Sequence, residues 1–196
     1  RGGAPPVARG SVPVECPDAE TEAGAAPLRR LSRIEYVSSL RDLLAPSGLA
    51  AEVDALEAEL QQVAPDGENE HLFTEMDARV SQRHIDAFYG VADALSRRLT
   101  ANAEQLSALV GACSASSALS EACLGDFTDG FGRRVFRRPV TTAERARYLE
   151  LRGTGTPPAE IARSVLFTFF LSPPFLYRFV HEATPLPSDP AVLAVS

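Results

Sequence analysis

The part of the sequence that most constrains the fold is PPAEIARSVLFTFFLS, residues 157–172. Thr156 followed by Pro157 is typical of a helix start, because the N–H that proline lacks would have no partner at the first helical position. Apolar residues then surround much of the expected helix, at Ile161, Val165, Leu166, Phe167, Phe169, Phe170 and Leu171. A helix that is apolar on most sides has to be buried. We therefore expect it to run through the core and to end at Pro173 and Pro174.

Helical spacing of apolar residues, three and four positions apart, also marks earlier stretches of the sequence. The positions expected to face the core are Leu31, Ile34, Val37, Leu40, Leu43 and Leu44 in one stretch, Leu49, Val53, Leu56, Leu60 and Val63 in a helix over 49–63, and Val80, Ile85, Phe88, Val91, Ala92 and Leu95 around a helix over 81–99. No alternating pattern is long enough to demand a sheet. The sequence predicts an all-α fold, an irregular multi-helix bundle with extended N-terminal and C-terminal segments.

Two short motifs predict where helices begin. Ser32 with Glu35, and Thr141 with Glu144, have the spacing of a capping box. In this motif the hydroxyl accepts a backbone N–H, and the glutamate accepts the N–H of the cap residue in return. We therefore expect helices to start directly after residues 32 and 141.

Composition divides the chain into three parts. Residues 1–27 contain Gly, Pro, Ala and acidic residues with little apolar periodicity, which predicts an extended leader or linker. Residues 28–180 are the predicted helical domain. Residues 181–196 are a Pro-rich connector, which we expect to lead into a continuation of the chain or towards a partner chain.

Charge excludes some classes of protein. The 196 residues include 19 arginines, no lysine and 26 acidic residues, which gives a net charge of −7. This balance opposes a general affinity for nucleic acid, whose phosphates attract basic proteins. No run of about 18 apolar residues is free of charge, so we predict no transmembrane segment.

Three cysteines bear on the redox compartment. Cys113 and Cys123 enclose nine residues in a Ser- and Ala-rich connection between two helical patterns, which favours a local disulfide. The alternative is that both are small apolar residues packed separately. Cys16 is left over, either as a free thiol or with a partner outside this sequence.

Three separated blocks of the sequence follow one order. They are LRRLSRIEYVSSLRDLL, RVSQRHIDAFYGVADALSRRL, and CLGDFTDGFGRRVFRRPVTTAERARYLEL with VLFTFFLSPPFLYRF. Together they resemble a family of exported planctomycete and myxobacterial proteins of unknown function, the planctomycete-specific-domain proteins, over about residues 28–179. The resemblance implies export, and it implies the N-terminal helical region of a larger protein.

The resemblance implies no catalytic residue. Some relatives are joined to a c-type cytochrome domain, which makes a c-type cytochrome a candidate partner, but this chain has no Cys-x-x-Cys-His motif and we predict no cofactor. We expect an exported scaffold or interaction module of the cell envelope, periplasmic, outer-envelope or extracellular, that docks on its C-terminal continuation or on a separate subunit. The alternative is a non-catalytic part of an oxidoreductase or polymer-degrading enzyme whose reactive group lies outside this segment.

The densest charge feature is GRRVFRRPVTTAERARYLELR, which contains Arg133, Arg134, Arg137, Arg138, Arg145, Arg147 and Arg152. One interpretation is structural, with guanidinium groups bonded to carboxylates and carbonyls of neighbouring helices. The other is a binding site for an anion or an acidic partner, formed by Arg133, Arg134, Arg137 and Arg138. The sequence has no Gly-rich phosphate loop that would decide in favour of the second.

Histidines and tyrosines are expected to have structural roles. His71, His84 and His181 lack the spacing of a metal site, and the acidic residues 66–71 lack the ligand order of a calcium-binding hand, so no metal is predicted. Tyr36 and Tyr89 are expected to make buried hydrogen bonds through their hydroxyls.

Overall fold

A computed structural model of the chain describes residues 29–65, 67–68, 74–75 and 81–178. Helices dominate this part and confirm the all-α class. In chain order the elements are β1 (Arg29–Arg30), α1 (Arg33–Leu44), η1 (Ala45–Ser47), α2 (Ala51–Asp54), α3 (Glu57–Gln62), β2 (Gly67–Glu68), β3 (Thr74–Glu75), α4 (Gln82–Leu99), α5 (Ala103–Val110), η2 (Ala112–Ala115), α6 (Glu121–Phe136), α7 (Thr142–Glu150), α8 (Pro158–Phe170), α9 (Pro173–Leu176) and β4 (Tyr177–Arg178). The predicted leader, residues 1–27, and connector, residues 181–196, lie outside the described residues.

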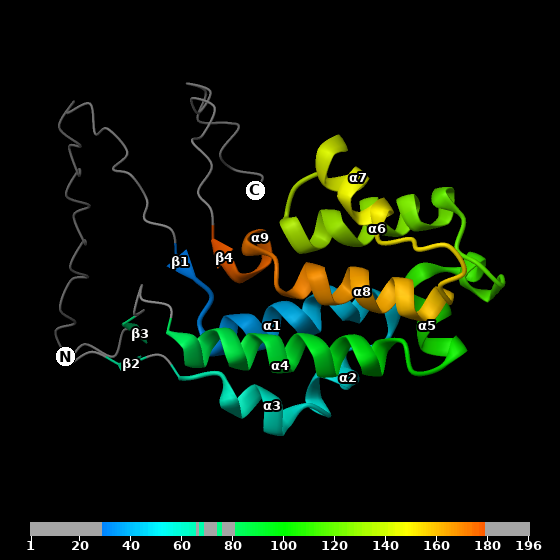
Figure 1. The fold of residues 1–196 in the computed structure, drawn as a ribbon. Helices are drawn as coiled ribbons and strands as arrows, with labels where there is room; N and C mark the ends of the chain where they lie inside the picture. Colours follow the sequence, from blue (N-terminus) through cyan, green and yellow to red (C-terminus); the bar gives the residue numbers. More distant parts are fainter. Residues whose placement is uncertain (1–28, 66, 69–73, 76–80, 179–196) are drawn as a thin grey trace, which may run out of the picture.

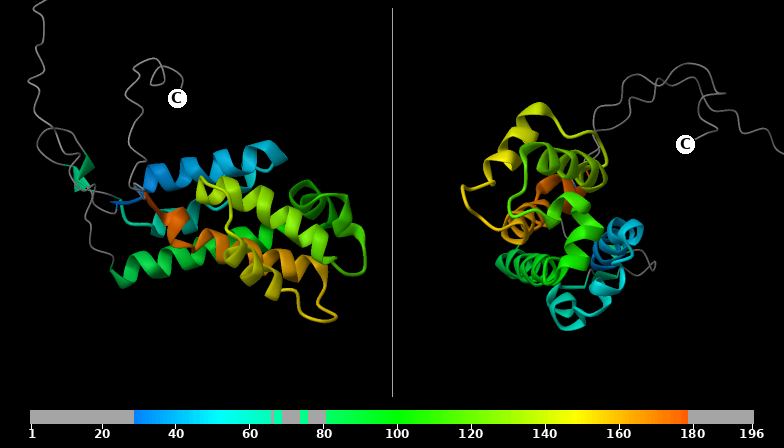
Figure 2. Two further views of the ribbon diagram at one scale, coloured as in Figure 1. Left: turned by 90° about the horizontal axis from the view of Figure 1, so that it is seen from above. Right: turned by 90° about the vertical axis from the view of Figure 1, so that its right-hand side faces the viewer.

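The helix predicted to run through the core is α8. It begins one residue later than expected, with Pro157 as its cap, and buries Ile161, Ala162, Val165, Leu166, Phe169 and Phe170. It lies side by side with α4, and the two helices run in opposite directions (Figure 1). Helices α6 and α7 lie on one side of this pair, and α2 and α3 lie on the other, as both figures show (Figure 2).

The N-terminal stretch buries Leu31, Leu40, Leu43 and Leu44 as the apolar pattern predicts, and it differs from the prediction at one position of α1. Ile34, expected to be buried, is 78% exposed, whereas Tyr36 is completely buried. The Tyr36 ring packs on Phe88 of α4 and Phe175 of α9, with ring centroids 4.9 and 5.9 Å away. Positions 34 and 36 differ by about 200° around a helix, so both cannot face the core. On α4, Ile85 is likewise exposed at its surface, and its expected burial is wrong.

The helix predicted over residues 49–63 is broken in two. Helices α2 and α3 are separated by Ala55 and Leu56, where the backbone of Leu56 leaves the helical region. Both sides of the break make contacts with the rest of the fold. The Leu56 side chain is buried, and the Glu52 carboxylate accepts hydrogen bonds from Arg98 of α4 and Gln105 of α5 at 2.9 and 2.7 Å.

Both predicted capping boxes are present. Ser32 accepts the backbone N–H of Glu35 at the start of α1, and Thr141 accepts that of Glu144 at the start of α7. In each case the glutamate also accepts the N–H of the cap residue. None of the helices in the described ranges is both long enough and apolar enough to cross a bilayer.

The first and last described elements lie together. Strands β1 and β4 pair antiparallel, with Arg29 opposite Arg178 and Arg30 opposite Tyr177. The Leu31 N–H extends this pairing by donating to the carbonyl of Leu176 at 2.8 Å. The start of α1 is thereby held beside the end of α9, and this contact forms one end of the site described next.

Candidate functional site: a groove lined by three arginines

A surface groove of about 400 Å³ lies where α1, the end of α6, α9 and β4 meet. It is lined by Ser39, Asp42 and Leu43 of α1, Arg134 and Arg137 at the end of α6, Phe175 of α9, and Arg178 of β4. We call it the arginine groove. Three guanidinium groups and one carboxylate line it, so positive charge predominates in the groove.

Two of these arginines are anchored by backbone carbonyls. Arg134 donates through Nη1 to the carbonyl of Leu43, and Arg137 donates through Nη1 to the carbonyl of Pro174, both at 3.1 Å. A guanidinium has five N–H donors, so each anchored side chain keeps donors for a ligand. The Arg137 guanidinium also lies 6.0 Å from the centre of the Phe175 ring, which favours a fixed orientation.

The backbone of Arg137 is unusual. Its φ of 56° and ψ of 24° place it in the left-handed helical region, directly after the last residue of α6. Glycine is the common residue at such a position, because a Cβ there costs roughly 1 kcal/mol. Arg137 therefore occupies a strained position, and its side chain contacts the groove.

Partial burial and a neighbouring charge act on two of these arginines. Burial lowers the pKa of Arg134, and burial together with the nearby charge of Arg178 lowers the pKa of Arg137. The charge of Glu35 opposes part of the second effect. Both guanidinium groups stay protonated at neutral pH, since arginine normally titrates above about 12. An anion in the groove would replace lost hydration and relieve the repulsion between two cations.

Arg178 was not among the residues predicted for this site. Arg178 is exposed on β4 and follows Arg137 by 41 positions in the chain. The pairing of β4 with β1, in which Arg178 lies opposite Arg29, places it at the groove. The interval between Arg137 and Arg178 in sequence carries no periodic signal. Asp42 and Ser39 were missed for the same reason, because they reach the groove from α1.

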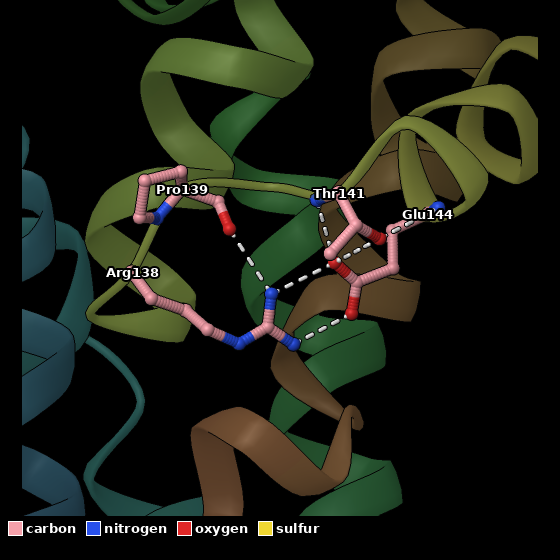
Figure 3. A network of polar contacts seen from close by, with 4 residues as sticks. All are labelled: Arg138, Pro139, Thr141 and Glu144. Carbon is pink, nitrogen blue, oxygen red and sulfur yellow. Dashed lines mark hydrogen bonds and ion pairs between the residues drawn. The ribbon is translucent and has the colours of Figure 1, made fainter. Parts of the chain in front are cut away.

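The other two predicted anion contacts do not line the groove. Arg133 is exposed on α6, and no described residue bonds to its side chain. Arg138 forms a two-pronged ion pair with Glu144, at 2.7 and 2.9 Å, and also donates to the carbonyl of Pro139 (Figure 3). The structure therefore divides the predicted cluster, with Arg134 and Arg137 at the groove and Arg138 in a structural contact.

The contact between Arg138 and Glu144 joins the end of α6 to the start of α7. Thr141 donates to the same carboxylate through its backbone N–H and its hydroxyl, both at 2.9 Å (Figure 3). The hydrogen bond from Arg138 is the main cause that lowers the pKa of Glu144 to about 2, and the contacts from Thr141 add to it. This carboxylate is therefore charged at any ordinary pH, and both of its oxygens already accept hydrogen bonds from Arg138 or Thr141.

Two of the remaining arginines of the cluster have acidic partners. Arg145 pairs with Asp129 at 2.9 Å, and Arg152 approaches Glu121 at 3.9 Å. Arg147 is exposed, and its side chain bonds to no residue of the described part. These contacts hold α7 against α6 and show the structural role expected for much of this sequence.

The predicted disulfide is present in the structure. Cys113 of η2 is bonded to Cys123 in the first turn of α6, with their Cα atoms 6.1 Å apart. Cys123 is buried and Cys113 is exposed at its surface. The bond ties α6 to the connection that precedes it, at the end of the helix remote from Arg137. Cys16 lies outside the described residues.

The described residues contain no group of three or more His, Cys, Asp and Glu side chains arranged to hold a metal ion. His71 and His181 lie outside the described residues. The hydrogen-bond expectation for the tyrosines is wrong. Tyr89 is 56% exposed, and the buried Tyr36 hydroxyl has no hydrogen-bond partner among the described residues.

One comparison with known proteins bears on this part of the chain. Residues 123–179 match the model of PSD5, a protein family of unknown function (DUF1595). The matched range contains Arg134, Arg137 and Arg178, but not the α1 side of the groove. No curated protein and no solved structure matches the chain. The predicted relation to a family of unknown function is thus supported for the PSD5-like range, without an activity attached to it.

Proposed function

We propose that this chain is a helical interaction module of an exported cell-envelope protein, and that it binds an acidic segment of a partner in the arginine groove. The observation that carries the proposal is the convergence of Arg134, Arg137 and Arg178 on one groove with a single lining carboxylate, Asp42. Guanidinium groups remain protonated, so they bind anions and do not transfer protons. This chemistry supports a binding role for the groove. The alternative, a non-catalytic part of an oxidoreductase or polymer-degrading enzyme, places the reactive group outside this segment.

The position of the groove supports docking close to where the chain leaves the helical domain. Arg178 of β4 lines the groove, and β4 follows α9 directly at the end of the helical bundle. A partner that binds beside β4 would therefore have this surface within its reach. The Cys113–Cys123 disulfide is compatible with an oxidising compartment, as export requires.

The test is a binding titration with a defined acidic probe. A fluorescein-labelled eight-residue peptide with four glutamates is titrated with the full chain at low and moderate salt, and fluorescence anisotropy is measured. We expect binding that weakens as salt rises, because exposed charge pairs are screened. The double variant Arg134→Ala, Arg137→Ala should bind at least about tenfold more weakly, which corresponds to about 1.4 kcal/mol.

A matched control removes the same charge elsewhere. Arg133 and Arg147 are exposed and do not line the groove. The double variant Arg133→Ala, Arg147→Ala should therefore retain nearly all binding. Equal losses in the two double variants would show a response to net charge alone, and no binding by the unchanged chain would likewise contradict the proposal.

A further inference from the structure

We infer that the arginine groove has an intramolecular ligand, the acidic segment of this chain formed by residues 15–22, which competes with the partner for the site. The inference rests on the proposed function, since it names what regulates the same groove. Its basis is charge, the length of chain between segment and groove, and the register of β1 on β4.

The acidic segment and the arginine groove have opposite charges. Residues 15–22 read ECPDAETE and contain four acidic side chains, at Glu15, Asp18, Glu20 and Glu22. No arginine occurs between Arg9 and Arg29, so nothing within this stretch offsets their charge. After β4, by contrast, residues 179–196 contain only Glu182 and Asp189 as acidic residues. Of the two sequence stretches that flank β1 and β4, the one before β1 therefore has the higher density of acidic residues.

The chain between the acidic segment and β1 is long enough for the segment to contact the groove. Arg29 lies directly opposite Arg178 in the β1–β4 pair, and Arg178 lines the groove. Glu22 is seven residues before Arg29 and Glu15 is fourteen, so the chain can span about 23 to 50 Å from that point at 3.3 to 3.6 Å per residue. The whole segment can thus reach a groove that begins beside its own attachment point.

The covalent connection gives the acidic segment a high effective concentration at the groove. A ligand joined through a short linker is present at its site at about millimolar concentration. The chain therefore needs only a weak intrinsic affinity for the acidic segment to fill the groove for much of the time. A partner then has to displace the acidic segment, so only a partner that binds the groove more tightly than the tethered segment can dock.

Cys16 lies within the acidic segment and provides a direct test in the full chain. Ser39 lines the groove, and Ser39→Cys places a thiol there. Under mild oxidation we expect rapid formation of an intramolecular disulfide with Cys16, detected by peptide mass spectrometry without reduction. The same thiols in a chain that also carries Arg134→Ala and Arg137→Ala should react at least about fivefold more slowly, whereas Arg133→Ala and Arg147→Ala should leave the rate unchanged.

Neutralising the acidic segment tests the competition itself. The variant Glu15→Gln, Asp18→Asn, Glu20→Gln, Glu22→Gln keeps the length of the chain and removes the four charges. It should bind the four-glutamate peptide at least about threefold more tightly than the unchanged chain. The gain should disappear when Arg134 and Arg137 are also replaced by alanine.

The two measurements separate failure of this inference from failure of the proposed function. Probe binding that depends on Arg134 and Arg137 but does not change on neutralisation would overturn the inference and keep the proposed function. A crosslink rate that does not depend on these arginines would also overturn the inference. Absence of probe binding in every variant would reject the proposed function, while an arginine-dependent crosslink would still support the intramolecular contact.

Discussion

Arg137 combines a strained backbone with a side chain that lines the groove. Strain of this kind persists where the surrounding structure holds it, and it is found preferentially at functional sites. Here the side chain bonds to the carbonyl of Pro174 and lies near the Phe175 ring. At the scale of single residues, we therefore expect that relief of the backbone strain at Arg137 raises the stability of the fold, whereas loss of its guanidinium weakens binding.

Replacement of Arg137 by glycine should separate the two effects. Arg137→Gly and Arg137→Ala both remove the guanidinium, so both should weaken binding of the acidic probe. The glycine variant also removes the Cβ from the left-handed position, so it should be more stable than the alanine variant by about 1 kcal/mol. Urea unfolding of the two variants checks the difference, and equal midpoints would contradict the strain.

Glu144 is the residue for which pH dependence is expected. Its pKa is lowered from 4.5 to about 2 in the folded chain, first by Arg138 and then by Thr141. The unfolded chain therefore takes up the proton before the folded chain does as pH falls. The stabilisation is complete above about pH 5 and is lost progressively as pH falls from there to about 2.

The variant Glu144→Gln measures this contribution. It keeps a side chain that can cap α7 and loses the ion pair with Arg138, so it should be less stable by about 1 to 2 kcal/mol at pH 6. The difference in melting temperature should become less than half as large at pH 3. Glu150→Gln, an exposed position of the same helix, serves as the control and should show little effect at either pH. A difference that does not depend on pH would count against the role of the charge.

At the scale of elements, the close packing of α6 against its neighbours depends on small residues. A Cβ built on Gly132 would lie 2.7 Å from Val140 Cγ2 and 2.9 Å from Phe169 Cζ of α8. Both neighbours are part of the packed interior or rest against it. The approach of α6 to α8, and hence the place of Arg134 and Arg137 at the end of α6, depends on the missing side chain.

Gly132→Ala should therefore destabilise the fold by about 1 to 3 kcal/mol, the usual cost of overpacking a core. Gly130 lies two residues earlier on the same helix and has open space around a built Cβ. Gly130→Ala should instead stabilise the chain by about 0.5 to 1 kcal/mol, because alanine is the better helix former. Chemical unfolding of both variants tests the pair, and loss of stability of the same size in both would refute the packing argument.

At the scale of the whole molecule, two connections restrict how the helices are arranged. The β1–β4 pair holds the start of α1 at the end of α9, and the Cys113–Cys123 disulfide joins η2 to α6. The first contact forms one end of the arginine groove. The second is covalent, so it links the stability of the fold to the redox state of its surroundings.

The disulfide predicts a definite thiol count. Denatured, unreduced chain should take up at most one alkylating group, at Cys16, and three after reduction. Loss of the bond through Cys113→Ser and Cys123→Ser should reduce stability by about 2 to 3 kcal/mol, the effect of closing a short loop. Mass spectrometry and urea unfolding provide the two measurements. Three alkylated cysteines without reductant would remove the bond and the main physical support for export.

Local patterns in the sequence determined much of the fold. The capping boxes at Ser32 and Thr141 and the apolar helix α8 were predicted, because capping and burial depend on residues close together in the chain. The same holds for the pairing of Cys113 with Cys123, which are separated by ten positions. The break between α2 and α3, by contrast, accompanies contacts of Glu52 with distant helices.

The site was decided by the tertiary structure. The sequence has four arginines within six residues, which suggested one cluster. In the fold, Arg138 pairs with Glu144, whereas Arg134 and Arg137 line the groove. Arg178 joined them only through the register of β4 on β1. Periodicity reports which residues share a face of one element, whereas a groove formed by α1, α6, α9 and β4 depends on long-range packing that no local pattern encodes.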